Sequence, residues 1–381
     1  MVISSLQGGG AERVMTIMAN YWAAAGWSIT LLTLDDGAAP LSYALDSRVR
    51  HIPLAVAEHS GNTLTALRNG FRRLRALRRG LRQSRPDAIL SFMDITNVTT
   101  ILATRGMGVP VIVSERSDPA CNFPGRTWSR LRQLVYPLAD AVVVQSQGAM
   151  DYFSPKVQLR ARIIPNPVLS AQPSNATLSM QLPRPALVAM GRLVQAKGFD
   201  LLLRAFAQLK DQRHDWTLVI LGDGPLRAEL ESLRNQLGLE QRVLMPGRVS
   251  NPYDALKQSD LFVMSSRYEG FPNALCEAMS CGLAVICTDC PSGPREIIRD
   301  GIDGLLVANE DVTALAKAMD SLMGNETERV RLGERATEVT KRFALSEVMR
   351  LWEDALVAVC AERPSYEEHV RRLSTNGASQ R

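Results

Sequence analysis

The chain has 381 residues, of which 46% are hydrophobic and 22% charged, and its net charge is +5. This balance is typical of a soluble globular protein. No apolar run approaches the roughly 18 residues of a membrane span, so no membrane-spanning helix is expected. The start, MVISSLQGGG, lacks the basic and apolar regions of a signal peptide, so none is expected. A single core rarely extends over this length, and two domains are predicted.

Short apolar runs alternate with segments of helical periodicity along the chain. Strands are expected at 28–34, 87–92, 110–115, 140–146, 186–191, 216–222, 260–266 and 283–288. These runs are almost continuously apolar, as strands covered on both faces must be. Segments such as 199–210 and 226–238 carry apolar residues at steps of three and four, which predicts helices. The alternation indicates an α/β fold with parallel sheets and right-handed crossovers.

The order of these segments predicts where the domains divide. A stretch rich in Pro, Ser, Asn and Gln follows residue 162 and predicts a linker. We expect an N-terminal domain at 1–165, a C-terminal domain at 166–344 and a helix at 345–360 that returns to the first domain. The polar tail, 361–381, is predicted to be disordered. Before the first glycines the chain offers only the short strand MVISSL, so the natural start is expected a few residues upstream.

Four of the six cysteines lie close together, between residues 276 and 290. Of these, Cys287 and Cys290 alone have the C-x2-C spacing, whereas zinc sites of this kind use two such units. We therefore expect reduced, buried thiols and no metal site.

Three glycines, Gly8, Gly9 and Gly10, end the first strand and open a helix. Glycines at such a turn let backbone N–H groups approach an anion, and the helix N-terminus favours negative charge. A tight turn without a ligand is the alternative. The spacing is not G-x-G-x-x-G, which argues against a dinucleotide site.

A second set of phosphate-binding features follows the strand at 186–191. Arg192 comes directly after that strand and Lys197 follows at a helix start. Two cations beside the carboxyl end of a strand suit a diphosphate, although an isolated Arg and Lys are often solvated surface charges. The turn Gly222-Asp223-Gly224-Pro225 permits another close approach of the backbone.

Two glutamates, Glu269 and Glu277, are eight positions apart in the stretch RYEGFPNALCEAM. Asn273 is a plausible cap for the helix that follows, which would place Glu269 just before the helix and Glu277 about one turn inside it. Carboxylates accept hydrogen bonds from vicinal hydroxyls and so clamp a ribose or a hexose. A hydrolase pair is the alternative, but the nearby cations and glycine turns favour a sugar diphosphate.

These motifs together resemble the retaining glycosyltransferases of family 4. The resemblance rests on Glu269-x7-Glu277, on Gly191-Arg192 with Lys197, and on the early Gly-Gly-Ala-Glu-Arg. It spans residues 1–360 and implies the GT-B fold, in which two Rossmann-like domains face each other across a cleft. Within the family, the stretches DAILSFMDITNVTTILA and VPVIVSERSDP are most similar to bacterial N-acetylgalactosaminyltransferases that extend polyprenyl-diphosphate-linked glycans.

The resemblance implies a role for each matching residue. Arg192 and Lys197 would hold the diphosphate of a UDP-sugar donor, Glu277 the ribose hydroxyls and Glu269 the donor sugar. The other donor contacts that it implies are Gly9, Gly10, Gly222, Arg248, Val249, Phe271, Asn273, Ala274 and Leu275. The sequence has no D-x-D, which agrees with a transferase that needs no metal or other cofactor.

One position departs from the family pattern. Related motifs read Ser-Glu-His-Ser, but here Arg116 replaces the histidine. An arginine is no general base at neutral pH, although it binds hydroxyls and phosphates. We therefore expect Arg116 to be a catalytic residue that binds a hydroxyl or a phosphate. The base is then expected to be the leaving phosphate oxygen, which lies on the same face of the sugar as the incoming acceptor.

Residues 68–85 hold eight arginines and no acid. Apolar residues at 71, 74, 77 and 81 predict an amphipathic helix over 64–84. The arginines predicted to meet the acceptor or the membrane are Arg68, Arg72, Arg75, Arg79 and Arg82. Such a face suits anionic lipid and a polyprenyl diphosphate, while a merely solvated basic face is the alternative. Aromatic residues do not interleave with the arginines, which disfavours nucleic acid. Trp128 and Tyr136 either add an interfacial contact or belong to the core.

The sequence thus predicts a peripheral enzyme at the cytoplasmic face of the cell membrane that transfers a sugar from a UDP-sugar to a polyprenyl-diphosphate-linked saccharide. Two alternatives stay open at this point: a transferase with a soluble acceptor, and a non-catalytic module that binds a nucleotide sugar. The four histidines fall in no site motif and receive no role. The donor sugar, the linkage and the oligomeric state are left open.

Overall fold

The computed structural model describes residues 1–57, 63–123, 125–170, 181–249 and 251–361. The chain forms two compact units, each with its own sheet and core. Of the described residues, those in 1–165 and 346–361 belong to unit 1, and those in 166–345 belong to unit 2. Nearly all of the predicted tail lies outside the described residues.

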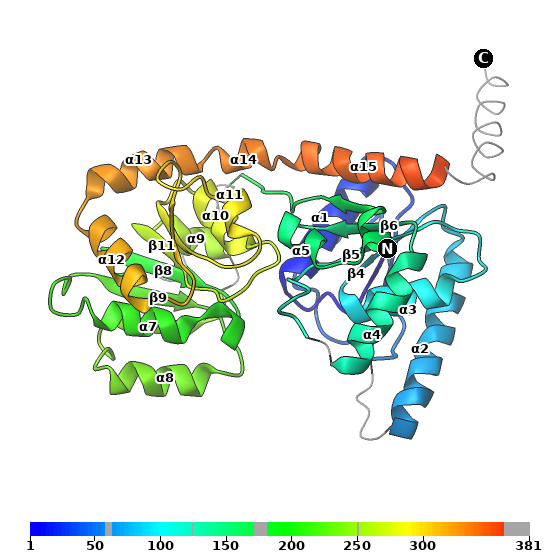
Figure 1. Ribbon diagram of the computed structural model, residues 1–381, viewed down its shortest axis with the longest axis horizontal. Helices are drawn as coiled ribbons and strands as arrows, with labels where there is room; N and C mark the ends of the chain where they lie inside the picture. Colours follow the sequence, from blue (N-terminus) through cyan, green and yellow to red (C-terminus); the bar gives the residue numbers. More distant parts are fainter. Residues whose placement is uncertain (58–62, 124, 171–180, 250, 362–381) are drawn as a thin grey trace, which may run out of the picture. The chain divides into compact units, whose positions relative to one another are not determined.

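Unit 1 is built on a sheet of seven parallel strands, which Figure 1 shows with helices on both faces. In chain order the strands are β1 (Val2–Ile3), β2 (Thr30–Thr33), β3 (Arg50–Pro53), β4 (Ile89–Phe92), β5 (Val111–Ser114), β6 (Ala141–Val144) and β7 (Ala161–Ile163). Their order across the sheet is β3-β2-β1-β4-β5-β6-β7. The strand order therefore reverses between β1 and β4, and such switch points are where open α/β sheets bind ligands.

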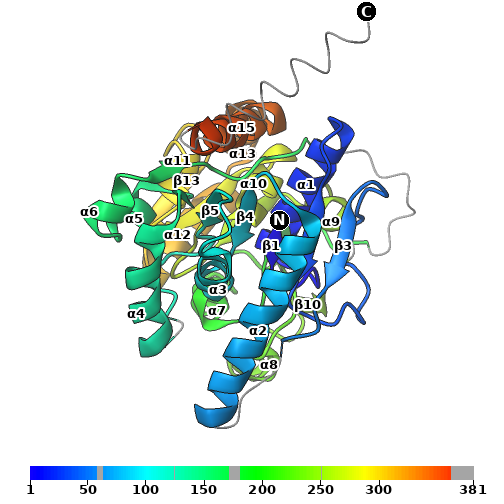
Figure 2. The ribbon, with the colours of Figure 1, turned by 90° about the vertical axis from the view of Figure 1, so that its right-hand side faces the viewer.

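The helices of unit 1 cover this sheet with apolar faces. They are α1 (Gly10–Ala24), α2 (Thr63–Ser84), α3 (Asp94–Thr104), α4 (Arg126–Val135), α5 (Gln147–Asp151), α6 (Pro155–Gln158) and α15 (Leu345–Ala361), with the short helix η1 (Tyr136–Leu138). α2 packs beside α3, as Figure 2 shows, and buries Leu77 and Leu81. Trp352 of α15 lies against Phe92, with ring centroids 6.0 Å apart. Among the described helices, none combines the length and the apolar character needed to cross a membrane.

Unit 2 has a six-stranded parallel sheet of the same kind. Its strands are β8 (Ala186–Met190), β9 (Thr217–Leu221), β10 (Val243–Gly247), β11 (Leu261–Met264), β12 (Val285–Asp289) and β13 (Leu305–Ala308), in the order β10-β9-β8-β11-β12-β13. Its helices are η2 (Gln195–Lys197), α7 (Phe199–Ala207), α8 (Arg227–Gln236), α9 (Pro252–Leu256), α10 (Asn273–Ser280), α11 (Pro294–Ile297), α12 (Val312–Met323), α13 (Glu326–Ala336) and α14 (Val339–Arg342). The switch point lies between β8 and β11.

All eight strands expected from apolar runs are present, so the predicted α/β fold with two parallel sheets is confirmed. The sequence did not predict β3, β7, β10 and β13, which are the outer strands of the two sheets. An outer strand has one neighbour and is less covered, so its residues need not be uniformly apolar. The central β1 is as short as its sequence predicts, and both of its residues are fully buried.

Candidate functional site

The features predicted to bind a phosphate meet at the switch point of unit 2. Gly191 and Arg192 follow β8, and the loop that carries Glu269 follows β11, the next strand across the sheet. Because both strands are parallel, these segments lie at the same edge of the sheet. The guanidinium of Arg192 is exposed and makes no hydrogen bond or ion pair with any residue that the structure describes. It is therefore available to an anionic ligand.

Two glycines of the next turn bring its backbone against this edge. A Cβ atom at Gly222 would overlap the carbonyl oxygen of Gly191, and Gly222 has a φ of +143°. A Cβ atom at Gly224 would overlap the backbone of Leu193. The turn after β9 can thus lie against the loop after β8 only because both residues are glycine.

Lys197 and Glu269 are joined directly. The Lys197 ammonium donates to Glu269 Oε1 at 2.6 Å, and Ser266 Oγ donates to the same oxygen at 2.6 Å. The backbone of the pair is also held, because Ser265 Oγ donates to the Lys197 carbonyl at 3.0 Å and Ser292 Oγ donates to the Glu269 carbonyl at 2.7 Å. A cation at the end of η2 and a carboxylate in the loop after β11 therefore lie side by side at the switch point, and hydrogen bonds hold both segments.

Gly198 connects this lysine to α7 and allows a prediction about stability. Its φ is +60°, and a Cβ atom there would overlap the carbonyl oxygen of Ser265. Gly238 has nearly the same φ, +66°, with no atom within 4 Å of the added Cβ. We expect Gly238→Ala to cost about 1 kcal/mol of unfolding free energy through its φ alone, and Gly198→Ala to cost about 1–3 kcal/mol more through overpacking. Urea unfolding of both variants measures the difference; equal losses would contradict the close approach.

The second glutamate lies on α10. Glu277 is the fifth residue of this helix, and Glu277 and Glu269 are each 8% exposed. The prediction that Asn273 caps the helix is wrong, because Pro272 occupies the cap position and Asn273 is the first helical residue. The Asn273 side chain instead accepts a hydrogen bond from Asn166 Nδ2 at 2.8 Å. This contact ties the start of α10 to the first residue of unit 2.

The other residues proposed to contact the donor in unit 2 differ in exposure. Arg248 is exposed after β10. Phe271 is buried and packs edge-on against Phe343, and Leu275 is fully buried. Val249 and Ala274 pack partly against the same core. A ligand would therefore meet Phe271 and Leu275 through their backbone rather than through their side chains.

In unit 1, Gly9 and Gly10 lie at that unit's own switch point, after β1. Gly8 has a φ of +102°, whereas Gly9 is extended at −177° and precedes α1. The Glu12 carboxylate occupies the space that a Cβ atom of Gly9 would need. The absence of a side chain at Gly9 thus lets Glu12 fold back over the glycine turn.

Arg116 lies after β5, two strands from the glycine turn. Its guanidinium stacks on the Phe92 ring, 4.2 Å from the centroid, and its Nη1 donates to Ser114 Oγ at 3.3 Å. Burial lowers the pKa of Arg116 to about 9, and the negative charge of Glu12 acts in the opposite direction. The group is still largely cationic at neutral pH, as a residue that binds an anion or a hydroxyl requires.

A buried polar network next to Arg116 was missed by the sequence reasoning. The Glu115 carboxylate accepts hydrogen bonds from Arg132 Nη1 at 3.2 Å and from Tyr136 at 2.9 Å. Arg132 also donates to Tyr152, and Asn97 donates to Tyr136. Burial raises the pKa of Glu115 to about 7 despite the Arg132 charge. The one sequence feature that could have indicated this network is that Glu115 directly follows an apolar strand. Tyr136 is fully buried, so an interfacial role for this residue is wrong.

The cysteines were the residues considered in the sequence for a metal site. All six cysteines are free thiols in the structure; Cys276, Cys287 and Cys290 are buried as predicted, whereas Cys281 is half-buried. Within the described ranges, no group of three or more His, Cys, Asp or Glu residues is placed to hold a metal ion.

Comparisons with known proteins identify the family. Residues 9–167 match the family described as glycosyl transferase 4-like domain, and residues 178–339 match glycosyl transferases group 1. A curated relative from Campylobacter jejuni is 30% identical over 92% of this chain and 96% of its own length; it is a GalNAc-alpha-(1->4)-GalNAc-alpha-(1->3)-diNAcBac-PP-undecaprenol alpha-1,4-N-acetyl-D-galactosaminyltransferase. The chain belongs to the group 1 glycosyl transferases.

A second relative of this glycosyltransferase comes from the same organism. It is an N-acetylgalactosamine-N,N'-diacetylbacillosaminyl-diphospho-undecaprenol 4-alpha-N-acetylgalactosaminyltransferase, 28% identical over 91% of this chain and 96% of its own length. Among solved structures, Anabaena HepE in complex with UDP and glucose has a TM-score of 0.77 at 18% identity, and covers 93% of this chain and 99% of its own. Sucrose-phosphate synthase from Thermosynechococcus elongatus has a TM-score of 0.79 at 20% identity, over 94% and 98% of the two chains. These likenesses confirm the GT-B fold.

Proposed function

We propose that this glycosyltransferase transfers a sugar, with GalNAc as the first candidate and another hexose or N-acetylhexosamine as the alternative, from a UDP-sugar to a polyprenyl-diphosphate-linked saccharide, and that it retains the configuration of the donor sugar. Two full-length relatives, by their names, transfer N-acetylgalactosamine to saccharides on a diphospho-undecaprenol. The observation that carries the donor half is the cation–carboxylate pair of Lys197 and Glu269 at the switch point of unit 2. The proposed place of action is the cytoplasmic face of the cell membrane.

The donor would bind across the loops after β8 and β11. Arg192 and Lys197 would neutralise the diphosphate, which gains negative charge as the bond to the sugar breaks. Glu277 would accept hydrogen bonds from the ribose hydroxyls and Glu269 from the sugar. Fixed cations then supply the charge stabilisation that a bound metal supplies in other transferases, so no metal is required in this proposal.

The chemical step would exchange one bond for another on the same face of the sugar. The bond between C1 of the sugar and the phosphate oxygen breaks, and a bond from C1 to the acceptor hydroxyl oxygen forms. The proton of that hydroxyl passes to the leaving phosphate oxygen, so the products are UDP and the extended saccharide. Arg116 would orient the acceptor through its guanidinium, because it cannot take the proton at neutral pH.

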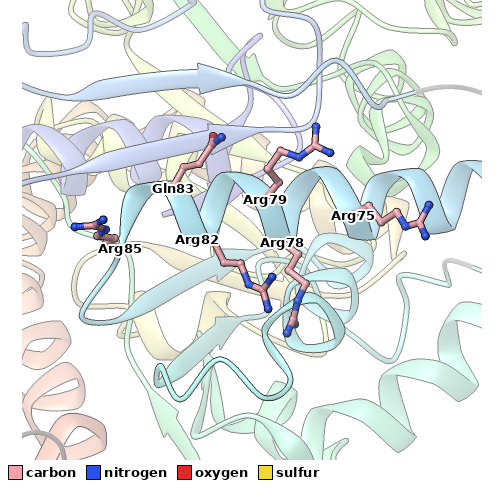
Figure 3. A pocket seen from close by; sticks show the side chains of 6 residues that line it. All are labelled: Arg75, Arg78, Arg79, Arg82, Gln83 and Arg85. Atoms are coloured by element: carbon pink, nitrogen blue, oxygen red, sulfur yellow. The ribbon is translucent and has the colours of Figure 1, made fainter.

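The acceptor half of the proposal rests on α2. Of its seven arginines, the five at 68, 72, 75, 79 and 82 are exposed. An open hollow of about 670 Å³ is lined by Arg75, Arg78, Arg79, Arg82, Gln83 and Arg85, and Figure 3 shows the first five along α2 and Arg85 just beyond its end. Arg78 also has a structural task, since it donates to the carbonyl group of Ala103, near the end of α3, and to that of Arg105, which follows this helix. Several cations within one surface hollow suit a diphosphate or anionic headgroups.

The apolar face of α2 is shorter than predicted. Leu77 and Leu81 are buried and Leu74 packs partly against the core, but Phe71 is 56% exposed. The Arg75 guanidinium lies over the Phe71 ring at 4.1 Å from its centroid. The exposed ring and the neighbouring arginines give the first half of α2 both parts of a surface that binds at a lipid interface.

A donor screen tests the proposal as a whole. The purified chain is incubated with UDP-GalNAc, UDP-GlcNAc, UDP-glucose and UDP-galactose, each with a lipid-linked saccharide extract, and UDP release is measured. We expect release that depends on both the donor and the extract, and a product whose new linkage has the α configuration. Absence of turnover with every donor would refute the transferase proposal.

The role of α2 gives a separate prediction. Replacing Arg72, Arg75 and Arg79 together by glutamine is expected to lower kcat/KM on the lipid-linked acceptor by about 100-fold, since each charge near headgroups contributes about 1 kcal/mol. Turnover on a short soluble saccharide is expected to change less than threefold. The matched control replaces three exposed cations of unit 2, Arg204, Lys210 and Lys257, and should leave both rates unchanged. Equal losses on both acceptors would instead indicate a soluble acceptor.

A further inference from the structure

Arg267 lies two residues before Glu269, in the loop after β11, and none of the roles assigned above uses it. Its side chain is only 17% exposed. Nη1 and Nη2 donate to the two carboxylate oxygens of Asp200 at 2.8 and 2.7 Å, which is a bidentate pair. Nε donates to Glu310 at 3.1 Å. An arginine fork that uses its three nitrogens in this way holds its partners in one geometry.

The partners of Arg267 lie on both sides of Lys197. Nη1 donates to the Gln195 carbonyl at 3.0 Å, and the Arg267 backbone N–H donates to the Ala196 carbonyl at 2.8 Å. Asp200, beyond Lys197, is in the first turn of α7. The short helix η2 and the start of α7 are thus fastened to the β11 loop before and after the lysine.

We propose that Arg267 is a positioning residue for the donor site: it fixes η2 against the β11 loop and so sets where the Lys197 ammonium stands relative to Glu269. The inference rests on the proposed function, in which Lys197 neutralises the leaving diphosphate. Arg267 itself does not touch Lys197 or Glu269 in any contact described above. It acts through the main chain of residues 195–197 and through Asp200.

Accurate placement of the Lys197 ammonium matters most in the chemical step. The diphosphate gains negative charge as the sugar departs, so a cation displaced by about 1 Å loses more in the transition state than in the bound donor. Ground-state binding is shared with the glycine turns, Arg192 and Glu277, which Arg267 does not hold. Loss of the Arg267 contacts is therefore expected to lower kcat while the KM for the donor changes little.

The experiment compares Arg267→Gln with Arg213→Gln. Arg213 is a matched control because it also lies in unit 2 and pairs with an aspartate, Asp320, at 2.7 Å, but does so away from the switch point. Backbone hydrogen exchange is followed by mass spectrometry in the wild-type chain and both variants without any ligand. In Arg267→Gln we expect the amides of Lys197 and Gly198 to exchange at least about tenfold faster through local opening, with no such change in Arg213→Gln.

Kinetics with the donor found by the screen complete the test. We expect Arg267→Gln to lower kcat about 10- to 100-fold, with a KM for the donor within threefold of the wild type, and Arg267→Lys, which keeps the charge without the fork, to lose less. Unchanged exchange at residues 197 and 198, or an equal increase in Arg213→Gln, would overturn the positioning role. So would a rise in KM at constant kcat. Absence of turnover in the wild type would refute the proposed function. The exchange measurement would still show whether Arg267 fixes η2 against the β11 loop.

Discussion

Replacing Lys197 by methionine is expected to lower kcat about 100- to 1,000-fold, which is the effect of removing one preorganised group that stabilises developing charge. Lys197 lies at the switch point of unit 2, bonded to Glu269, where the leaving diphosphate of the donor is proposed to bind. Methionine keeps most of the length and the apolar stem of the side chain but removes the charge. The measurement is UDP release at saturating donor, together with UDP affinity by calorimetry, which should fall about tenfold.

Two controls separate loss of chemistry from loss of structure. Lys197→Met leaves Glu269 without its ammonium partner, so some loss of stability is expected. In the double variant Lys197→Met/Glu269→Gln this unpaired charge is absent, and stability should recover while kcat stays low. Replacing Lys210, an exposed lysine in the turn that follows α7, by methionine should leave both properties as in the wild type. A Lys197→Met variant with more than a third of the wild-type kcat would contradict the proposed role.

The largest effect on stability is expected in unit 1, from Arg132→Met. The Arg132 and Glu115 side chains are each 1% exposed and are joined at 3.2 Å. Removing one member of a buried pair leaves the other charge uncompensated, which typically costs about 3–5 kcal/mol. Arg132 also donates to the Pro119 carbonyl and to Tyr152, and those acceptors lose their donor. Urea unfolding of unit 1 at pH 8 measures this loss.

The pH dependence of this loss follows from Glu115. Burial raises the pKa of Glu115 from 4.5 to about 7, so the folded state binds this proton more tightly than the unfolded state does. The contribution of Glu115 to stability is therefore present below about pH 4.5 and declines as the pH rises to about 7. At pH 5 the carboxyl is protonated and needs no counter-ion, so Arg132→Met should cost much less there than at pH 8.

A double variant gives the control for this second prediction. Arg132→Met/Glu115→Gln removes both charges while the amide oxygen can still accept from Tyr136. It should recover most of the stability at pH 8, and its stability should no longer depend on pH between 5 and 8 through this group. Equal losses for Arg132→Met at pH 5 and pH 8 would contradict the raised pKa of Glu115.

The sequence was informative about this protein wherever an element or a motif is formed by residues that are close together in the chain. Central strands are covered on both faces and must be apolar throughout, so eight of them could be located from composition alone, whereas the four outer strands could not. The short motif from Glu269 to Glu277 and the pair Arg192 and Lys197 indicated a sugar diphosphate, because glycine turns, cations and carboxylates have few other joint uses. The family followed from these motifs and is confirmed.

Tertiary structure decided which of these residues lie together. Lys197 and Glu269 are 72 positions apart, and only the parallel pairing of β8 with β11 brings their loops to one edge of the sheet. The same applies to the ion pairs of Arg267 with Asp200 and of Glu115 with Arg132, which no spacing in the sequence indicates. The partners of polar side chains depend on residues that are distant in the chain but close in space. Asn273, for example, accepts a hydrogen bond from Asn166 instead of capping α10. Local patterns report the backbone that a segment prefers, but contacts between distant segments exist only once the sheet has set their register.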